Sequence, residues 1–215
     1  MTDRNAGSTL HLAVRIALLA AIYVLAGRLG FLASAVHPVV SSAWPPSGIA
    51  LAALLLFGKR LWPGIAIGAF VVNITGGIAP LAAATIAMGD TLEGVLAAWF
   101  LTTIAGFRTA PDPLGRLRDV LALVVLAAIL STPVAATVGV TVLTVFGGAP
   151  AIPYGTAWMA WWTGDAVGIL LVTPLILTWA KGPKLRVTAR DASEAAVLSI
   201  VLIAFTVVLF QAPFS

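Results

Sequence analysis

The chain has 215 residues, of which 60% are hydrophobic and 9% charged, and its formal net charge is +4. Soluble domains are roughly 45–50% apolar and about 25% charged, so this composition excludes an ordinary soluble domain and indicates that the bilayer is the solvent. Cysteine is absent, which excludes a disulfide framework, a thiolate metal site and a cysteine nucleophile.

Apolar runs long enough to cross the hydrocarbon core, which takes about 20 residues, occur about seven times. In chain order the predicted spans are residues 11–36, 44–58, 61–76, 80–107, 120–146, 157–180 and 194–211. We therefore predict an all-α fold, a polytopic transmembrane helical bundle. Residues 1–215 are expected to form a single integral-membrane domain with a short cytoplasmic tail of about residues 1–10.

The second and third spans are short, since each would reach only ~22 Å as a helix. They are joined by Lys59-Arg60. The pair is predicted to form either two full spans or a deep hairpin, and in both cases its two ends lie on the same side.

Basic residues fall on alternate loops, and the other loops carry no Lys or Arg. This asymmetry sets membrane orientation, so the N-terminus is predicted to be cytoplasmic and residue 215 to lie on the outer side. An eighth crossing would be needed after Ser215 to reach any cytoplasmic output domain. Because the basic residues lie in short gaps between apolar runs, nucleic acid is not expected as a partner.

Proline and glycine mark contacts and bends within the bundle. Pro133 and Pro174 fall inside predicted spans and should kink their helices. Small residues four apart occur in two helices, at Gly64 and Gly68 and again at residues 164 and 168. Such spacing allows close helix contact in a membrane, and we expect contacts within the chain, with a dimer face as the alternative.

The informative charges are those that lie deep within spans, because an ionisable side chain in lipid is costly unless it is paired or hydrated. They are Arg28, Asp90, Glu93 and Asp165. Counted from the outer ends of their spans, Arg28 and Asp165 lie ~12 Å deep and Asp90 lies ~15 Å deep. Two interpretations stay open: a buried network in which Arg28 is the counter-ion, and a polar pocket in which a ligand or proton changes the helix packing.

Tryptophans gather at the two predicted membrane surfaces, the pattern of an aromatic belt. The outer group is Trp44, Trp158, Trp161 and Trp162, and the inner group is Trp62, Trp99 and Trp179. Trp158 and the pair Trp161-Trp162 lie one helical turn apart and just above Asp165, so some of their faces could line the proposed pocket. A carboxylate beneath aromatic rings suits a cation or an amphipathic ligand.

Asn73, near the outer end of the third span, is a further candidate that either joins this cluster or forms a simple inter-helix hydrogen bond. His11 and His37 lie near membrane edges, so no metal site is expected. A retinal pigment would need a lysine within a span, and the lysines lie in loops. No phosphate loop, nucleophile elbow or paired catalytic motif is present, so we expect neither an enzyme nor a cofactor.

Three ordered blocks carry a family resemblance: WPPSGIALAALLLFGKRLWPGIAIGAFVVN at 44–73, GDTLEGVLAAWFL at 89–101 and WWTGDAVGILLVTPLIL at 161–177. Together they resemble the membrane-associated sensor domain family of the MASE type, the eight-helix class at the N-termini of bacterial histidine kinases and diguanylate cyclases. The resemblance covers roughly residues 10–212. Two departures stand out: the family's eighth crossing is missing, and Asp90 stands where an amide side chain is expected.

The resemblance implies a multi-pass sensor of the bacterial inner membrane that acts in two-component or cyclic di-GMP signalling, as a homodimer in its full-length form. It would detect a small molecule or another membrane protein in its outer half and pass the signal to a cytoplasmic kinase or cyclase. Two alternatives stay open. The chain could be a small transporter or transport subunit, since buried carboxylates and proline-broken helices also mark transport paths, or a docking module for another membrane protein.

Overall fold

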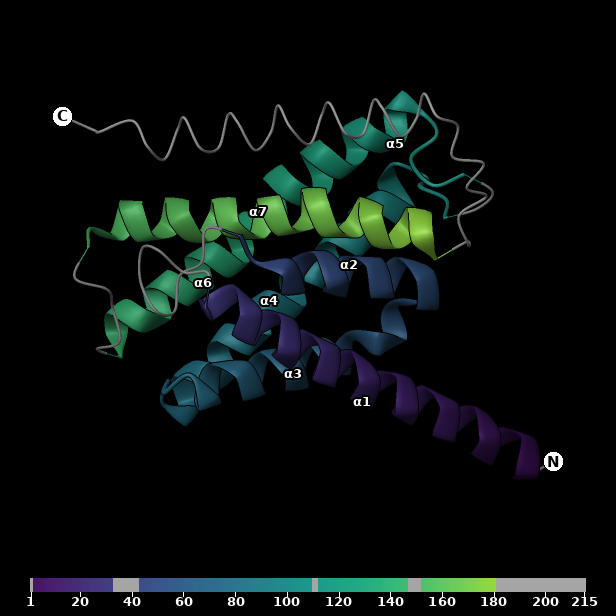
Figure 1. The fold of residues 1–215 in the computed structure, drawn as a ribbon, viewed down its shortest axis with the longest axis horizontal. Helices are drawn as coiled ribbons and strands as arrows, with labels where there is room; N and C mark the ends of the chain where they lie inside the picture. Colours follow the sequence, from purple (N-terminus) through teal and green to yellow (C-terminus); the bar gives the residue numbers. More distant parts are fainter. Residues whose placement is uncertain (1, 33–42, 110–111, 147–151, 181–215) are drawn as a thin grey trace, which may run out of the picture. The chain divides into compact units, whose positions relative to one another are not determined.

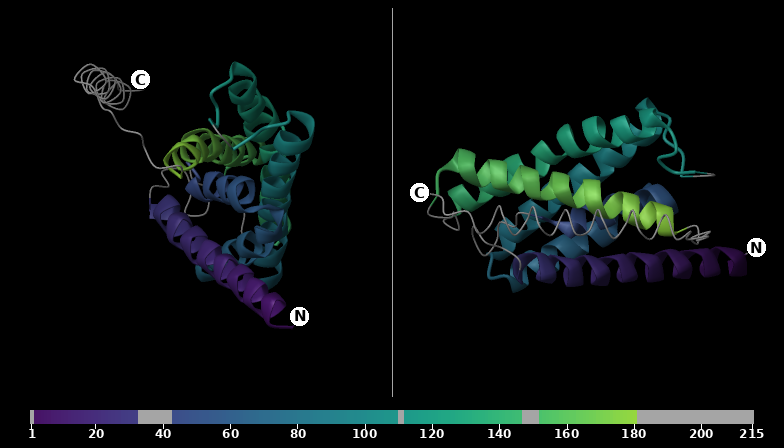
Figure 2. Two further views of the ribbon diagram at one scale, coloured as in Figure 1. Left: turned by 90° about the vertical axis from the view of Figure 1, so that its right-hand side faces the viewer. Right: turned by 45° about the horizontal axis from the view of Figure 1, so that its top comes forward.

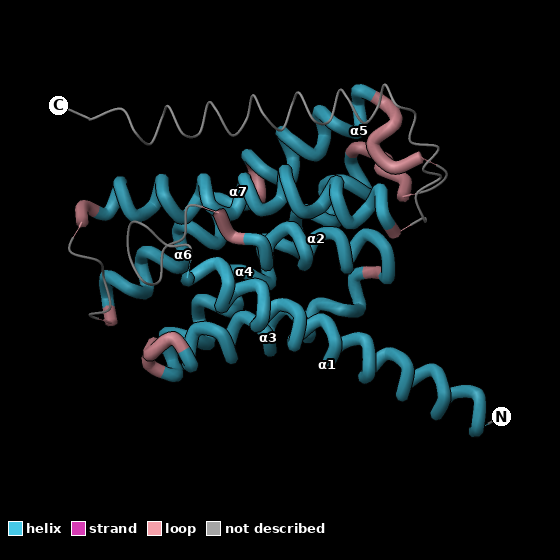
Figure 3. The backbone as a smooth tube through the Cα atoms, viewed as in Figure 1, coloured by secondary structure: helices cyan, strands magenta, loops and turns pink. Residues whose placement is uncertain are grey.

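The computed structural model describes residues 2–32, 43–109, 112–146 and 152–180 of the chain. In this part the chain consists of helices and loops, with no strand (Figure 3). The all-α prediction is confirmed. The chain divides into two compact units, Met1–Lys181 and Gly182–Ser215, and the second lies outside the described residues, so the single domain stays a prediction.

The described helical elements alternate with turns and loops along the chain. In order they are α1 (Thr2–Leu32), α2 (Pro45–Phe57), the 3₁₀ turn η1 (Lys59–Leu61), α3 (Trp62–Thr75), α4 (Pro80–Trp99), the π-helical η2 (Phe100–Ile104), α5 (Leu117–Ala122), the π-helical η3 (Leu123–Ile129), α6 (Thr132–Val145) and α7 (Tyr154–Trp179). Proline lies in the first turn of α2, α3, α4 and α6. Its missing N–H costs nothing there, so it fixes where each helix begins.

In the described part of the chain four stretches are long and apolar enough to cross a membrane: Thr9–Phe31, Pro80–Ile104, Leu117–Val145 and Tyr154–Trp179. They correspond to the first, fourth, fifth and sixth predicted spans, and the polytopic helical bundle is confirmed. The helices α2 and α3, with 13 and 14 residues, reach only ~20 Å. The seventh predicted span, 194–211, lies outside the described residues, and the count of seven stays a prediction.

The short helix α2 is the central element of the described bundle (Figure 1). It packs against α1, α4 and α7, while the surrounding helices contact one another in the order α1, α3, α4, α6 and α7. In an end-on view α2 lies among these helices (Figure 2). A helix covered by protein on several sides does not need to span the hydrocarbon by itself, which explains how α2 can be short.

Glycine allows these helices to approach closely. A Cβ at Gly64 would lie 2.8 Å from the Ile16 carbonyl oxygen of α1, and one at Gly68 would lie 2.7 Å from the Tyr23 Cβ. A Cβ at Gly168 would lie 2.7 Å from the Trp44 carbonyl carbon and closer still to its oxygen. The predicted contacts within the chain are confirmed, and these glycine faces are occupied rather than free for a dimer.

Proline acts differently in the two helices where a kink is expected. The stretch that begins at Leu117 is interrupted by a turn at Leu130 and Ser131, and α6 then starts with Pro133 in its first turn. Pro133 therefore accompanies a break in the helix. Pro174 lies inside α7, which continues past it to Trp179.

Candidate functional site

Among the described residues four carboxyl side chains are buried: Asp119 in the first turn of α5, and three on α4 and α7 that interact with one another. Asp90 and Glu93, one turn apart on α4, are 8% and 1% exposed, and Asp165 on α7 is 1% exposed. Glu93 lies close enough to interact electrostatically with both aspartates, and Asp165 with Asp90. Asp90 and Glu93 therefore share one helix face, as their spacing predicts, and that face is turned into the bundle interior.

Helix α2 contributes a hydroxyl to this group. Ser47 is 7% exposed, and its Oγ donates a hydrogen bond to Asp165 Oδ1 at 2.7 Å. Pro45 and Pro46 begin α2 immediately before Ser47, which places this hydroxyl in the first turn, at the crossing with α7. The same crossing is held by a backbone hydrogen bond from Trp44 N to Gly164 O at 2.9 Å.

Helix α1 contributes a second hydroxyl. Tyr23 is 1% exposed, and its phenol donates to Asp90 Oδ2 at 3.3 Å. We call the three carboxyls with these two hydroxyls the acidic cluster: Tyr23, Ser47, Asp90, Glu93 and Asp165. Its members come from α1, α2, α4 and α7, so the cluster connects four helices of the bundle.

The acidic cluster is incompletely paired. Glu93 Oε2 and Asp165 Oδ2 are buried and accept no hydrogen bond within the described structure. Among the described residues no Lys, Arg or His pairs with any of its three carboxyls. An unsatisfied buried acceptor costs about 1–3 kcal/mol, and like charges repel strongly in a low-dielectric interior. A proton or cation that reached these oxygens would therefore change how the four helices are held together.

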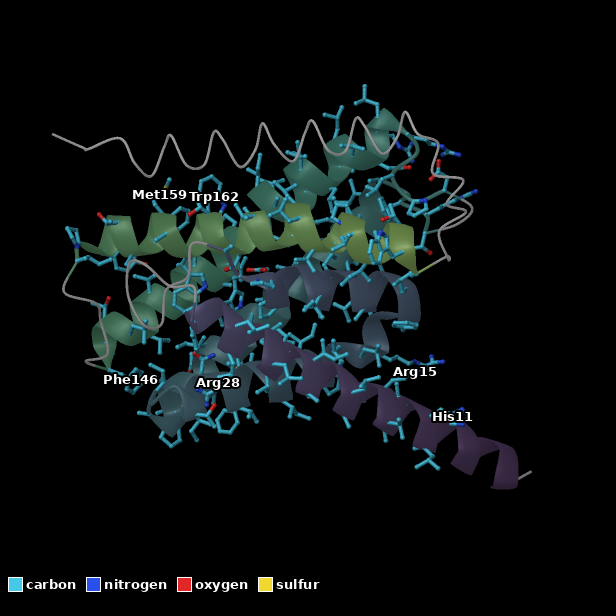
Figure 4. All side chains as sticks on the ribbon, viewed as in Figure 1. His11, Arg15, Arg28, Phe146, Met159 and Trp162 are labelled. Carbon is cyan, nitrogen blue, oxygen red and sulfur yellow. The ribbon has the colours of Figure 1, made fainter. Side chains whose placement is uncertain are left out.

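Arg28 is not the counter-ion of this cluster, and that interpretation is wrong. Its guanidinium is exposed and donates to the Thr75 carbonyl oxygen at 3.0 Å. The C-terminal carbonyls of a helix lack partners and attract cations, which explains why Arg28 binds the end of α3 instead (Figure 4).

The side-chain N–H of Asn73 is bonded outside the cluster. The residue is 4% exposed, and its side-chain N–H donates to Ala69 O at 2.9 Å within its own helix. This bond is neither the cluster contact nor the inter-helix bond that we predicted. Trp44 packs instead onto α1, with its ring 5.0 Å from the Phe31 ring and beside Tyr23.

The three tryptophans of α7 divide between two environments. Trp158 stacks on Trp162 with ring centroids 5.8 Å apart, and its indole N–H donates to Thr137 Oγ1 at 3.0 Å. Trp161 packs over Gly139, where a Cβ would lie 2.5 Å from its ring, and lies beside Asp165. Trp161 therefore lies between α6 and the acidic cluster, whereas the Trp158 indole of the stacked pair bonds to Thr137 of α6.

Two apolar grooves lie elsewhere on the described bundle. One, of about 510 Å³, is lined by residues of α1, α2, η1 and α7, and the other, of about 570 Å³, by residues of α3, α4 and α6. None of the nine residues predicted for ligand binding lines either groove. The predicted outer pocket is therefore not one of these two, and its existence stays a prediction.

Sequence reasoning missed the two hydroxyls of the cluster. Ser47 follows a pair of prolines at the start of an apolar run, and Tyr23 is one of two tyrosines in the chain. Tyr23 could have been recognised from its position in the middle of a span, because a buried phenol needs a hydrogen-bond partner there. Thr173 was also missed; it donates to Gly48 O at 3.0 Å and joins α7 to α2 a little further along the same crossing.

Comparison with known proteins gives one match. The MASE1 family model matches residues 15–215, which is most of the chain and includes every member of the acidic cluster. No curated protein and no solved structure matches. The four helices of membrane-spanning length agree with a membrane protein. The chain belongs to the MASE1 family of membrane-associated sensor domains.

Proposed function

We propose that this chain is a sensory input domain of the bacterial inner membrane, in which a stimulus acts on the acidic cluster. The family supports the sensory role and a non-catalytic domain. In this proposal the output is a cytoplasmic histidine kinase or diguanylate cyclase beyond the residues of this chain. The N-terminus lies on the cytoplasmic side and the outer loops face the stimulus.

The observation that carries the proposal is the bonding of the acidic cluster. Two hydrogen bonds, Ser47 to Asp165 and Tyr23 to Asp90, join α2 to α7 and α1 to α4. Both involve carboxyls without a cationic partner among the described residues. A change at one carboxyl would alter both its hydrogen bond and its repulsion with the others, and a local electrostatic change of this kind can shift the packing of a helical bundle.

The chemistry of the site favours a cationic stimulus. The Glu93 and Asp165 carboxyls contact each other, their buried oxygens Oε2 and Oδ2 lack a donor, and the Trp161 ring lies beside Asp165. Carboxylates and an aromatic face together suit a cation or a cationic amphiphile. A partner membrane protein that inserts a Lys or Arg side chain would supply the same group.

Intrinsic fluorescence provides the test. The purified chain in lipid nanodiscs is titrated with a panel of inorganic and organic cations, and tryptophan emission is recorded for the unsubstituted chain, Asp165→Asn and the control Asp112→Asn. Asp112 is an exposed loop residue. We expect a saturable response that Asp165→Asn removes and Asp112→Asn retains. No response to any member of the panel, or an equal response in both variants, would refute direct ligand detection at the cluster.

A second candidate function, transport, is favoured by the break in the fifth predicted span. Its π-helical segment ends in the turn at Leu130 and Ser131, and interrupted helices near buried carboxyls occur in transporters. Uptake of a cation into proteoliposomes would support transport. Saturable binding without uptake would support the sensor.

A further inference from the structure

The groove between α1, α2 and α7 has a distinct chemical character at one end. Its lining is aliphatic and aromatic apart from one charged residue, Arg15. Arg15 lies on the exposed face of α1, and its guanidinium carbon is 5.5 Å from the centre of the Phe57 ring at the end of α2. A cation held over this ring marks the groove end that adjoins η1.

The position of Arg15 along α1 places it close to a membrane surface. The apolar stretch of α1 begins at Thr9, so Arg15 lies ~9 Å along the helix axis from its start. A long arginine side chain at this depth reaches the headgroup region while its methylene stem covers apolar surface. η1 packs against α1 at the same end and carries Lys59 and Arg60, both exposed.

The rest of the groove runs away from this cationic end into the hydrocarbon. It passes between Leu18 and Ile22 of α1 on one side and Val172 and Ile176 of α7 on the other, with Ile49 of α2 in its wall. Leu18 and Ile22 are 58% and 40% exposed. The volume of about 510 Å³ falls within the roughly 300–1,000 Å³ of ligand sites.

We propose that this groove binds an anionic phospholipid of the surrounding bilayer, with its headgroup at Arg15 and an acyl chain along the apolar lining. The positive charge of Arg15 at the groove end favours an anionic lipid, because basic pockets between transmembrane helices bind anionic headgroups. No carboxylate is among the residues that line the groove with Arg15. The site is distinct from the acidic cluster, none of whose members lines the groove.

The test compares two lipids with the same acyl chains, phosphatidylglycerol and phosphatidylcholine, by native mass spectrometry of the full chain released from detergent. We expect preferential retention of phosphatidylglycerol. Arg15→Gln should weaken its binding about fivefold, the effect of one basic residue near a charged membrane surface, and leave phosphatidylcholine unchanged. The matched control is Arg116→Gln, because Arg116 is also exposed but lies outside the groove. This variant should retain phosphatidylglycerol as well as the unsubstituted chain does.

A second variant tests the apolar part separately from the charge. Ala53 lines the groove, and Ala53→Leu should reduce retention of both lipids; its control is Ala66→Leu in the groove of α3, α4 and α6. The proposal would be overturned if the chain retained the two lipids equally, or if Arg15→Gln and Arg116→Gln had equal effects on phosphatidylglycerol binding. It would also be overturned if Ala66→Leu lost more lipid than Ala53→Leu. Finally, a dimer without bound lipid that dissociates in Ala53→Leu would show that a second copy of the chain occupies the groove.

Discussion

Replacement of Gly168 by alanine should separate α2 from α7. The added Cβ would lie 2.7 Å from the Trp44 carbonyl carbon, whereas carbon atoms rest at about 3.5–4.0 Å. The atom that it meets is backbone, so no side chain can rotate away. The two helices must therefore move apart by about 1 Å at this crossing.

The size of the effect follows from the contacts at the same crossing. A movement of about 1 Å would stretch the Ser47–Asp165 bond of 2.7 Å and the Trp44–Gly164 bond of 2.9 Å beyond hydrogen-bonding range. Overpacking costs about 1–3 kcal/mol, and each hydrogen bond within a membrane bundle contributes about 0.6 kcal/mol. We expect the free energy of unfolding to fall by about 2–4 kcal/mol.

The measurement is denaturant unfolding in mixed micelles, followed by circular dichroism. The control is Gly155→Ala in the same helix, where a Cβ would meet no atom within 4 Å, and its free energy of unfolding should stay within about 0.5 kcal/mol of the unsubstituted chain. If the two variants unfold alike, the close crossing of α2 and α7 does not exist as described.

Three further substitutions probe the acidic cluster and its surroundings by the same unfolding measurement. Asp165→Ala removes the 2.7 Å bond from Ser47 and should cost about 1–3 kcal/mol; unchanged stability would mean that this contact contributes nothing. Arg28→Gln should cost less than about 1 kcal/mol, because its contact is exposed; a loss as large as that of Asp165→Ala would restore the ion-pair interpretation. Tyr23→Phe removes the hydrogen bond to Asp90 and should cost about 0.6 kcal/mol, and a more stable variant would contradict the bond.

The fold class and most span positions could be predicted because membrane spans depend on runs of apolar residues, which are local in the sequence. Helix ends were less certain. The sixth span was predicted from residue 157, yet α7 begins at Tyr154, directly after Pro153. Polar residues in its first turn hide this start from hydropathy, and the proline that precedes it was the better signal.

The partners of the buried groups could not be predicted in the same way. Depth along a span gives the position of a residue on the helix axis, but it does not give the direction in which the side chain points. Arg28 and Asp165 were placed at one depth on that basis, yet the Arg28 guanidinium is directed to the end of α3 and not to Asp165. Ser47 was missed because one hydroxyl barely changes the hydropathy of an apolar run.

The architecture suggests why the acidic cluster lies at the start of α2. This helix is the central one, and its first turn is fixed to α7 by glycine packing, by a backbone hydrogen bond and by Ser47. Its other end continues through η1 toward the groove that contains Arg15. Because α2 is a rigid helix of only ~20 Å, a shift at its first turn would also move its far end. In the proposed sensor, α2 is therefore the element that would carry a change at the carboxyls to the opposite membrane surface.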